Sequence, residues 1–325
     1  MSEHRALLRQ AFIASQGLAT ARLEPLQPDA SFRCYFRIHT HAQRWMLMDA
    51  PPASENLPAF IAIAQHLQRL GLRSPAVHAA DIENGFALLE DLGDATFTRL
   101  LASGEDETEL YTLAIDVLRC LHDHPQATHV RLPHYGQQRL LDEAVLLVDW
   151  YWPAVHGHAA PTGVRETYLQ VWQTVLQTLS SEPQTLVLRD FHVDNLLRIT
   201  GASRIQQCGV LDFQDAVLGS AAYDVVSLLE DARRDLTPGL AASMLDRYLH
   251  AVPAAERERF MHDYTVLGAQ RHCKVIGIFQ RLCSRDGKPH YLAHLPRIKR
   301  LLHHHLQQPC LAPLREWLMR YSLLA

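Results

Sequence analysis

Two short segments of the sequence place oxygen-bearing side chains at spacings that could support phosphoryl transfer. In "LRDFHVDN" (188–195), Asp190 precedes Asn195 by five positions, and "LDFQD" places Asp212 seventeen positions after Asn195. A carboxylate beside an attacking hydroxyl can accept its proton, and a carboxamide with a second carboxylate offers the hard oxygen ligands that Mg²⁺ prefers. The alternative interpretation is that these residues only form turns and cap a helix.

The order of the two segments favours catalysis over ordinary turns. Protein kinases carry H-R-D-x-x-x-x-N followed by D-F-G. "LRDFHVDN" matches the R-D-x-x-x-x-N part, with Leu188 at the place of the first histidine, and Asp212 and Phe213 end an apolar run. Both segments are rich in β-forming residues and lie in a part of the chain that otherwise has helical spacing.

The elements around these segments predict an α+β, protein-kinase-like fold of two lobes. The spacing predicts a helix over 3–16, strands in 32–40 and 44–50, a helix in 55–72 that stops at Gly71 and a strand pair that turns at "ENG". The sequence after "EDLGD" is predominantly helical. We therefore expect a small β-rich N-terminal lobe over 1–92, a hinge near 88–94, and a larger, mostly helical C-terminal lobe over 93–325.

Composition narrows the class of protein. The residues are 48% hydrophobic, the formal net charge is −4, and the six cysteines form no CxxC pair. These features predict a globular chain with reduced thiols that does not bind nucleic acid. Without an apolar run of about 20 residues or a secretory signal, we expect a cytoplasmic protein that does not interact with membranes, and a monomer.

Three consecutive histidines in "LLHHHLQQ" (301–308) could suggest a metal site. Three neighbouring side chains on a helix spread through about 200°, so they cannot all face one ion. We therefore expect a solvated helical face.

The chain resembles the aminoglycoside phosphotransferase and choline kinase group across nearly its whole length. The resemblance rests on "LLEDLGD", "LRDFHVDNLL" and "GVLDFQDAVLGSAAYDVVSLL". It implies ATP and Mg²⁺ as cofactors, Asp190 as the catalytic carboxylate, and Asn195 and Asp212 as the metal ligands. It also implies that Asp224 braces the catalytic loop.

Three further segments resemble one branch of that group: "DASFRCYFRI", "MLMDAPP" and "QRHCKVIGIFQRLCSRDGKPHYL". Enzymes of this branch phosphorylate N-acetylmuramate and N-acetylglucosamine at the anomeric C1 hydroxyl during peptidoglycan recycling. The resemblance therefore implies an amino sugar as the small-molecule substrate. A kinase for an aminoglycoside, choline or homoserine remains the alternative, as does a pseudokinase-like binding protein.

The nucleotide site departs from common patterns. None of the 15 glycines forms GxGxxG or a P-loop, and the strand 44–50 has Met48 where a phosphate-binding lysine is expected. An arginine, Arg33 or Arg37, could replace this lysine. The residues that we assign to nucleotide binding, with the last two acting through main-chain atoms at the hinge, are Ser31, Phe32, Arg33, Met48, Glu90 and Leu92.

Two groups of residues could bind the acceptor sugar. The first follows a helix in "LLVDWYWPAVHG", where aromatic faces could stack on a sugar and polar groups could bind its hydroxyls. The second is a basic stretch that would suit an anionic substrate such as the lactyl carboxylate of N-acetylmuramate. The alternative interpretation of the first group is a core aromatic cluster, and that of the second is an exposed, salt-bridged helix. With the loop histidine, the assigned substrate residues are Asp149, Trp150, Tyr151, His192, Arg271 and Lys274.

Overall fold

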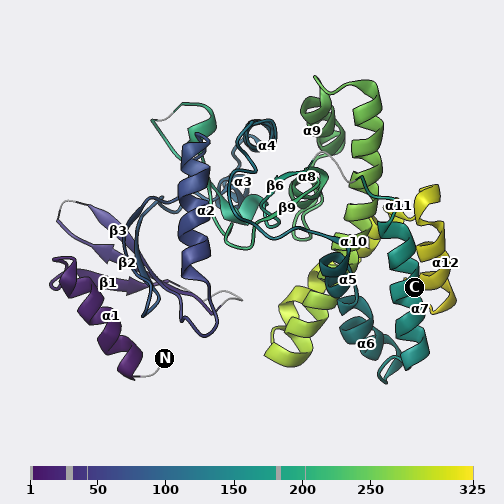
Figure 1. The fold of residues 1–325 in the computed structure, drawn as a ribbon, viewed down its shortest axis with the longest axis horizontal. Coiled ribbons are helices and arrows are strands. Elements are labelled where there is room, and N and C mark those ends of the chain that lie inside the picture. Colours follow the sequence, from purple (N-terminus) through teal and green to yellow (C-terminus); the bar gives the residue numbers. More distant parts are fainter. Residues whose placement is uncertain (1–2, 27–31, 42, 181–183, 202, 325) are drawn as a thin grey trace. The chain divides into compact units, whose positions relative to one another are not determined.

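The computed structural model of the protein describes residues 3–26, 32–41, 43–180, 184–201 and 203–324. The chain divides into two compact units, each built from two stretches of sequence (Figure 1). Unit 1 comprises Met1–Val130 and Val193–Ala216, and unit 2 comprises Arg131–His192 and Val217–Ala325. Unit 1 thus includes residues 93–130 and 193–216 in addition to the predicted N-terminal lobe. The predicted lobe boundary near residue 92 remains a prediction.

Unit 1 contains a five-stranded antiparallel sheet with the order β1-β2-β3-β5-β4. Both predicted strand pairs are confirmed, whereas the short edge strand β1 was not predicted. The strands are β1 (Arg22–Pro25), β2 (Cys34–His39), β3 (Arg44–Asp49), β4 (Val77–Asp81) and β5 (Phe86–Glu90).

Helix α1 (Glu3–Ser15) covers one face of this sheet (Figure 1). Phe12 of the helix stacks on Phe86 of β5 with ring centroids 5.8 Å apart. Phe36 pairs with Leu47 across β2 and β3, and both side chains belong to the same buried cluster. Burial of this apolar face fixes the register, since a one-residue slip would turn it toward solvent.

The turn between β4 and β5 requires glycine. Gly85 has a φ of +71°, and a Cβ atom there would lie 2.0 Å from the carbonyl oxygen of Ala50. The Ala50 N–H donates a hydrogen bond of 2.8 Å to the Gly85 carbonyl. This close backbone contact ties the end of β3 to the second hairpin, so "ENG" was correctly predicted as a turn.

The remaining elements of unit 1 are helices and a short hairpin. Asn56 caps α2, because its side chain accepts the Ala59 N–H at 3.1 Å. The hairpin β7–β8 is bound to the segments near the predicted hinge: Val210 N–H donates to Arg73 O and Arg198 N–H to Ala95 O. The bounds are α2 (Leu57–Arg69), α3 (Phe97–Ala102), α4 (Glu107–His122), η2 (Val193–Asn195), β7 (Leu196–Arg198), η3 (Ile205–Gln207) and β8 (Cys208–Val210).

Unit 2 is mostly helical, as predicted for the C-terminal part. Its longest element is the 33-residue helix α10, and the π-helix η1 lies between α5 and α6. The bounds are α5 (Gln137–Ala144), η1 (Leu147–Tyr151), α6 (Trp152–His156), α7 (Thr162–Leu176), β6 (Thr185–Val187), β9 (Val217–Gly219), α8 (Ala222–Leu229), α9 (Leu240–Leu249), α10 (Ala254–Asp286), η4 (Pro289–His294), α11 (Leu295–His305), η5 (Pro309–Leu311) and α12 (Ala312–Arg320).

The prediction of a solvated face for "LLHHHLQQ" was only partly right. His303 and His304 are exposed, whereas His305 is only 4% exposed and lies against Glu230, which belongs to a different element. The error arose because the burial of a single histidine depends on the tertiary packing of α11 against other helices, which the local pattern does not reveal.

Two expectations drawn from composition can be compared with the structure. All six cysteines are free thiols. Within the described ranges, no helix combines the length and the apolar character needed to cross a membrane.

Candidate functional site

Asp190 lies in a short loop of unit 2 that follows strand β6. Strand β6 pairs with β9, and the loop leaves it through Arg189, which adopts a positive φ of 70°. Such a conformation is uncommon for a residue other than glycine and is found most often at functional sites. The Asp190 N–H donates to the Leu188 carbonyl at 2.9 Å, which closes the turn.

Asp224 holds this loop from the first turn of α8. Its carboxylate accepts the N–H of Leu188 at 2.7 Å and the N–H of Arg189 at 2.8 Å. Asp224 is completely buried, so two backbone donors and one charged acceptor satisfy each other away from water. The bracing contact that the resemblance implied for Asp224 is therefore present.

Two cations from helix α10 lie on the loop. Arg271 Nη1 is 3.8 Å from Asp190 Oδ1 and donates to the Arg189 carbonyl at 3.1 Å. One turn further along the helix, the Lys274 ammonium lies 3.3 Å from the Tyr223 hydroxyl, which Arg271 also contacts at 3.3 Å. The structure therefore brings together three of the predicted residues: Asp190, Arg271 and Lys274.

A carboxylate that the sequence analysis missed anchors these cations. Glu143 of α5 forms ion pairs with Arg189 and with Lys274, the latter at 3.1 Å, and accepts a hydrogen bond from the Tyr135 hydroxyl. Lys274 and Arg189 lower the pKa of Glu143, although burial opposes this shift. No signal marked Glu143, because it occupies an ordinary position in an amphipathic helix.

The charges around Asp190 determine its protonation state. Burial by itself would raise the pKa of Asp190, but Arg271 and Lys274 outweigh this effect and lower the pKa to about 2. Three cationic side chains (Arg189, Arg271, Lys274) and two carboxylates (Asp190, Glu143) form this ion-pair cluster. Asp190 is therefore ionised at neutral pH.

His192 follows Asp190 in the loop and is only 6% exposed. Burial lowers the pKa of His192, while the nearby carboxylates of Asp231 and Asp190 partly oppose this shift. The imidazole is therefore neutral at pH 7. Its burial beside Asp231 is compatible with support of the loop, and its predicted contact with substrate remains a prediction.

In unit 1, the hairpin β7–β8 places Asn195 and Asp212 at the same end. Leu196 pairs with Val210 in the antiparallel ladder, Asn195 directly precedes β7, and Asp212 follows β8 after one residue. The Leu211 N–H donates to the Asn195 carbonyl at 2.9 Å, which extends the pairing up to these residues. The two predicted metal ligands therefore belong to neighbouring backbone segments.

Asp212 has a positive φ of 56°, and the buried side chain of the next residue holds its backbone in place. Phe213 is fully buried and stacks on Phe60 of α2 with ring centroids 5.0 Å apart. With this ring anchored, the backbone turns sharply at Asp212, whose side chain remains 38% exposed. A carboxylate held in this way can bind a cation without reorganising its loop.

Arg33 is the cation that contacts Asp212. Its Nη2 lies 2.7 Å from Asp212 Oδ1, and its Nε lies 3.4 Å from Glu55 Oε2. Arg37, the other candidate to replace the missing lysine, pairs instead with Asp91 and Asp94, each at 2.8 Å. Contact with a predicted metal ligand favours Arg33.

The other residues assigned to the phosphate region have different surroundings. Met48 is fully buried, and its sulfur accepts the Tyr35 hydroxyl at 3.5 Å. Phe32 is 71% exposed, and its N–H donates to Glu55 at 3.2 Å. Ser31 lies outside the described residues.

At the predicted hinge, the backbone N–H of Glu90 already forms a hydrogen bond within the protein. The Glu90 N–H donates to the Ala76 carbonyl at 2.8 Å, and its carboxylate pairs with Arg73. Leu92 packs near Gly209 of β8, where a Cβ atom would lie 3.1 Å from the leucine side chain. A nucleobase at Glu90 would have to donate to its carbonyl rather than accept from its N–H.

The predicted aromatic sugar platform lies in η1 and is only partly accessible. Asp149 is exposed and pairs with Arg165 at 2.8 Å. Trp150 is half-buried, whereas Tyr151 is 7% exposed and lies beneath Lys299, whose ammonium is 5.2 Å from the ring centroid. The role of these three residues in binding a sugar remains a prediction.

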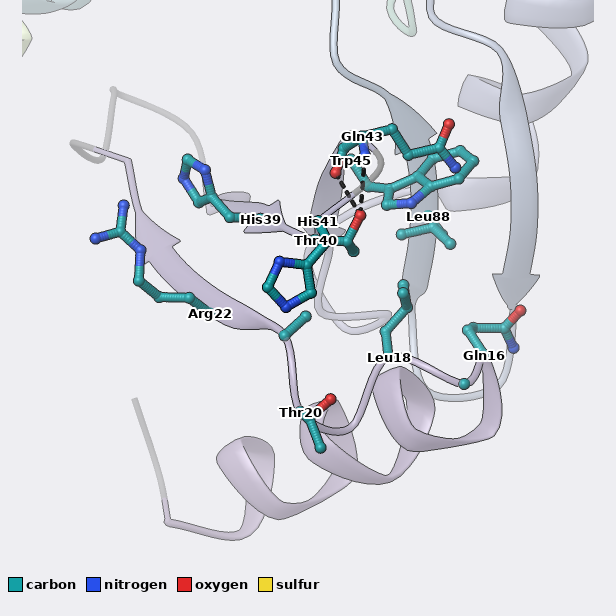
Figure 2. A pocket seen from close by; sticks show the side chains of 12 residues that line it. Gln16, Leu18, Thr20, Arg22, His39, Thr40, His41, Gln43, Trp45 and Leu88 are labelled. Atoms are coloured by element: carbon teal, nitrogen blue, oxygen red, sulfur yellow. Dashed lines mark hydrogen bonds between the residues drawn. The ribbon is translucent and has the colours of Figure 1, made fainter.

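Unit 1 also contains a cavity of about 730 Å³ near the end of α1 (Figure 2). Trp45 and Leu88 supply apolar side chains to its lining, and the hydroxyl of Thr40 donates to the Gln43 carbonyl at 2.7 Å beside it. None of the residues that we assigned to the nucleotide, metal or sugar lines this cavity. It is therefore separate from the predicted site.

Comparison with known proteins identifies the family of the chain. Residues 22–260 match the model of the phosphotransferase enzyme family. A protein of Caulobacter vibrioides named N-acetylmuramate/N-acetylglucosamine kinase is 34% identical over 99% of this chain and 98% of its own length. A protein of the same name from Pseudomonas putida is 37% identical over 83% of this chain and 79% of its own length.

Solved structures of kinases share the fold. The choline kinase LicA of Streptococcus pneumoniae aligns with a TM-score of 0.65 at 12% identity, over 93% of this chain and 100% of its own. The GDP complex of aminoglycoside 2'-phosphotransferase-IIIa aligns with a TM-score of 0.61 at 16% identity, over 90% and 97%. The predicted protein-kinase-like fold is thereby confirmed. The chain belongs to the phosphotransferase enzyme family and is an ATP-dependent phosphotransferase.

Proposed function

We propose that this chain is a kinase that uses ATP to phosphorylate the anomeric C1 hydroxyl of N-acetylmuramate, N-acetylglucosamine or both, in the recycling of cell-wall sugars. The observation that carries the proposal is the 34% identity to a kinase named for these two sugars over nearly the whole of both chains. The resulting product would be the sugar 1-phosphate, with ADP released.

In the proposed reaction, Asp190 orients the sugar hydroxyl and accepts its proton. With a pKa of about 2, Asp190 is ionised but only weakly basic. That suffices for phosphoryl transfer through a loose transition state, in which the proton leaves late and positioning dominates. An anomeric hydroxyl is more acidic than an ordinary alcohol and requires less of its base.

Asn195 and Asp212 would hold Mg²⁺. Their carboxamide and carboxylate oxygens suit a hard cation. Both residues lie at the same end of the β7–β8 hairpin. Bound there, Mg²⁺ would neutralise charge on the triphosphate. Arg33 would bind phosphate oxygens in place of the strand lysine, since a guanidinium forms strong charge-assisted hydrogen bonds with phosphate.

The charge around Asp190 supports an acidic acceptor. Arg271 lies 3.8 Å from Asp190 and Lys274 lies one turn further along the same helix, and these two cations would favour the lactyl carboxylate of N-acetylmuramate. The cationic aminoglycosides would be disfavoured by the same charge. We therefore rank N-acetylmuramate first among the acceptors.

A panel of acceptors tests this proposal. The protein is incubated with ATP, Mg²⁺ and, separately, N-acetylmuramate, N-acetylglucosamine, kanamycin, choline or homoserine. ADP release measures turnover, and phosphorus NMR identifies the position modified. We expect an anomeric phosphate on an amino sugar. Turnover of kanamycin, choline or homoserine alone would replace the proposal with one of those kinases, and ATP binding without ADP release from any acceptor would indicate a binding protein.

A further inference from the structure

Three side chains outside the proposed active site form a buried cluster in unit 2. Glu230 directly follows α8, His272 lies in the middle of α10, and His305 is the last residue of α11. His272 Nε2 lies 2.6 Å and His305 Nε2 2.7 Å from the same oxygen, Glu230 Oε2. The histidines are 2% and 4% exposed.

Helix α10 is shaped to accept the imidazole of His305. At Gly268, one turn before His272, a Cβ atom would lie 2.4 Å from His305 Nε2 and 2.6 Å from its Cε1. One turn earlier still, Tyr264 is buried, its pKa is raised by burial and by the nearby Glu230 carboxylate, and its ring lies 5.9 Å from that of His305. Residues 264, 268 and 272 share one face of the helix because they are spaced by four.

These donors match the preferences of a particular class of cation. Two imidazole nitrogens and one carboxylate oxygen lie within 4.8 Å of one another. Nitrogen-rich sets of this kind suit zinc and similar transition-metal dications, whereas Mg²⁺ and Ca²⁺ prefer oxygen ligands alone. We propose that Glu230, His272 and His305 form a binding site for one transition-metal dication of the zinc class.

Binding would exchange protons for the ion. In the hydrogen-bonded arrangement each Nε2 carries a proton directed at Glu230, and those protons leave when the nitrogens coordinate the metal. Tetrahedral bonds of about 2.0–2.1 Å place ligand atoms roughly 3.3 Å apart, so each histidine nitrogen would move away from Glu230 Oε2 by only about 0.6–0.7 Å. A water molecule would complete the coordination.

The position of the cluster gives the metal a structural role. It connects the end of α8, which carries the loop-bracing Asp224, to α10, which carries Arg271 next to His272. The ion would hold these helices and α11 together. It is distinct from the catalytic Mg²⁺ of the proposed function and does not depend on the identity of the acceptor.

Metal binding by the intact protein tests the site without any activity assay. Full-length protein is treated with chelator and dialysed against Zn²⁺ in the absence of nucleotide, and bound zinc is counted by elemental analysis. The test variants are His272→Gln and His305→Gln. The matched controls are His303→Gln and His304→Gln, which change exposed histidines in the same run.

We expect one zinc per chain in the wild type and both controls, and a loss of affinity of at least roughly tenfold in each test variant. Zinc binding that is absent from the wild type, or that survives both test substitutions, overturns the site. Circular dichroism of the metal-free variants establishes that they are folded.

A second measurement uses only wild-type protein, so it stands even if a variant does not fold. Loading with Co²⁺ in place of zinc should give the visible ligand-field bands of a four-coordinate nitrogen and oxygen site. An intense thiolate charge-transfer band would instead assign binding to cysteines, such as the neighbouring Cys273, and the absence of any visible band would also contradict the proposal.

Discussion

The guanidinium of Arg33 lies 2.7 Å from the carboxylate of Asp212, measured from Nη2 to Oδ1. This contact joins the residue that we propose for phosphate binding to one that we propose for Mg²⁺. It also offers a solution to the absence of a lysine in β3, where Met48 is fully buried. A cation can thus be supplied by the residue that directly precedes β2, instead of by β3.

Replacement of Arg33 by Met should weaken ATP binding. Loss of a charge-assisted hydrogen bond to phosphate costs roughly 1.5–3 kcal/mol, which corresponds to a rise of about tenfold to a hundredfold in the KM for ATP. Arg33→Lys should retain part of the affinity. Arg22→Met, which removes an exposed arginine of the adjacent strand, is the control. An unchanged KM for ATP in Arg33→Met would remove Arg33 from the phosphate site.

Replacement of Asp224 by Asn should loosen the catalytic loop. An asparagine offers one acceptor where the carboxylate offers two, so a buried N–H of Leu188 or Arg189 loses its partner. We expect the free energy of unfolding to fall by roughly 2–4 kcal/mol and kcat to fall more than the KM for ATP rises. Urea denaturation and steady-state kinetics measure both effects. Asp246→Asn, at an exposed position of α9, should change neither.

The pH dependence of folding stability and of kcat/KM should reflect the low pKa that the surrounding cations give to Asp190. The pKa of this carboxyl falls from 3.8 to about 2 in the folded protein, so ionised Asp190 stabilises the fold above about pH 4 and this contribution is lost as the pH falls toward 2. For the same reason, protonation of Asp190 should not reduce kcat/KM anywhere above about pH 4.

Arg271→Met tests the origin of this shift. Removal of the nearest cation should raise the pKa of Asp190 and move the acid limb of the kcat/KM profile to higher pH. Arg285→Met, on the same helix but exposed, serves as the control. Identical acid limbs in the wild type and Arg271→Met would show that Arg271 does not set the protonation of Asp190.

Two glycines in helices should respond in opposite directions to substitution by alanine. A Cβ atom at Gly277 would lie 2.3 Å from the backbone of Leu146, so Gly277→Ala should destabilise the protein by roughly 1–3 kcal/mol or more. At Gly163, no atom lies within 4 Å of the added carbon, and Gly163→Ala should stabilise by roughly 0.5–1 kcal/mol. Thermal unfolding of both variants checks the pair, and equal effects would contradict the close packing of α10.

Local patterns were sufficient to predict the strands of the main hairpins and most helices. Aromatic and apolar residues in 34–39 and 44–49 on either side of a polar turn indicate the first hairpin. In the second hairpin, "ENG" supplies Gly85, which the close backbone contact with Ala50 requires. The segment around Asp190 was recognised from spacing alone. Such features depend on residues near one another in the sequence, which is why they could be predicted.

Contacts between distant segments could not be predicted. Arg33 and Asp212 are separated by 179 positions in the sequence. Glu143 and Arg189, which form an ion pair, are separated by 46 positions. The burial of His305 depends on Gly268 of another helix, so the run of three histidines was interpreted as wholly solvated. The short strand β1 lacks a pattern of its own, because its pairing with β2 determines it.

Turnover by Asp190→Asn tests the central claim most directly. ADP release is measured with N-acetylmuramate and Mg²⁺, and ATP binding is followed separately by thermal shift. Asp246→Asn, at an exposed position of α9, is the control. Loss of the base should lower kcat by about a hundredfold to ten-thousandfold while ATP binding and folding persist. An Asp190→Asn protein that turns over as fast as the wild type would contradict the assignment of the catalytic residue.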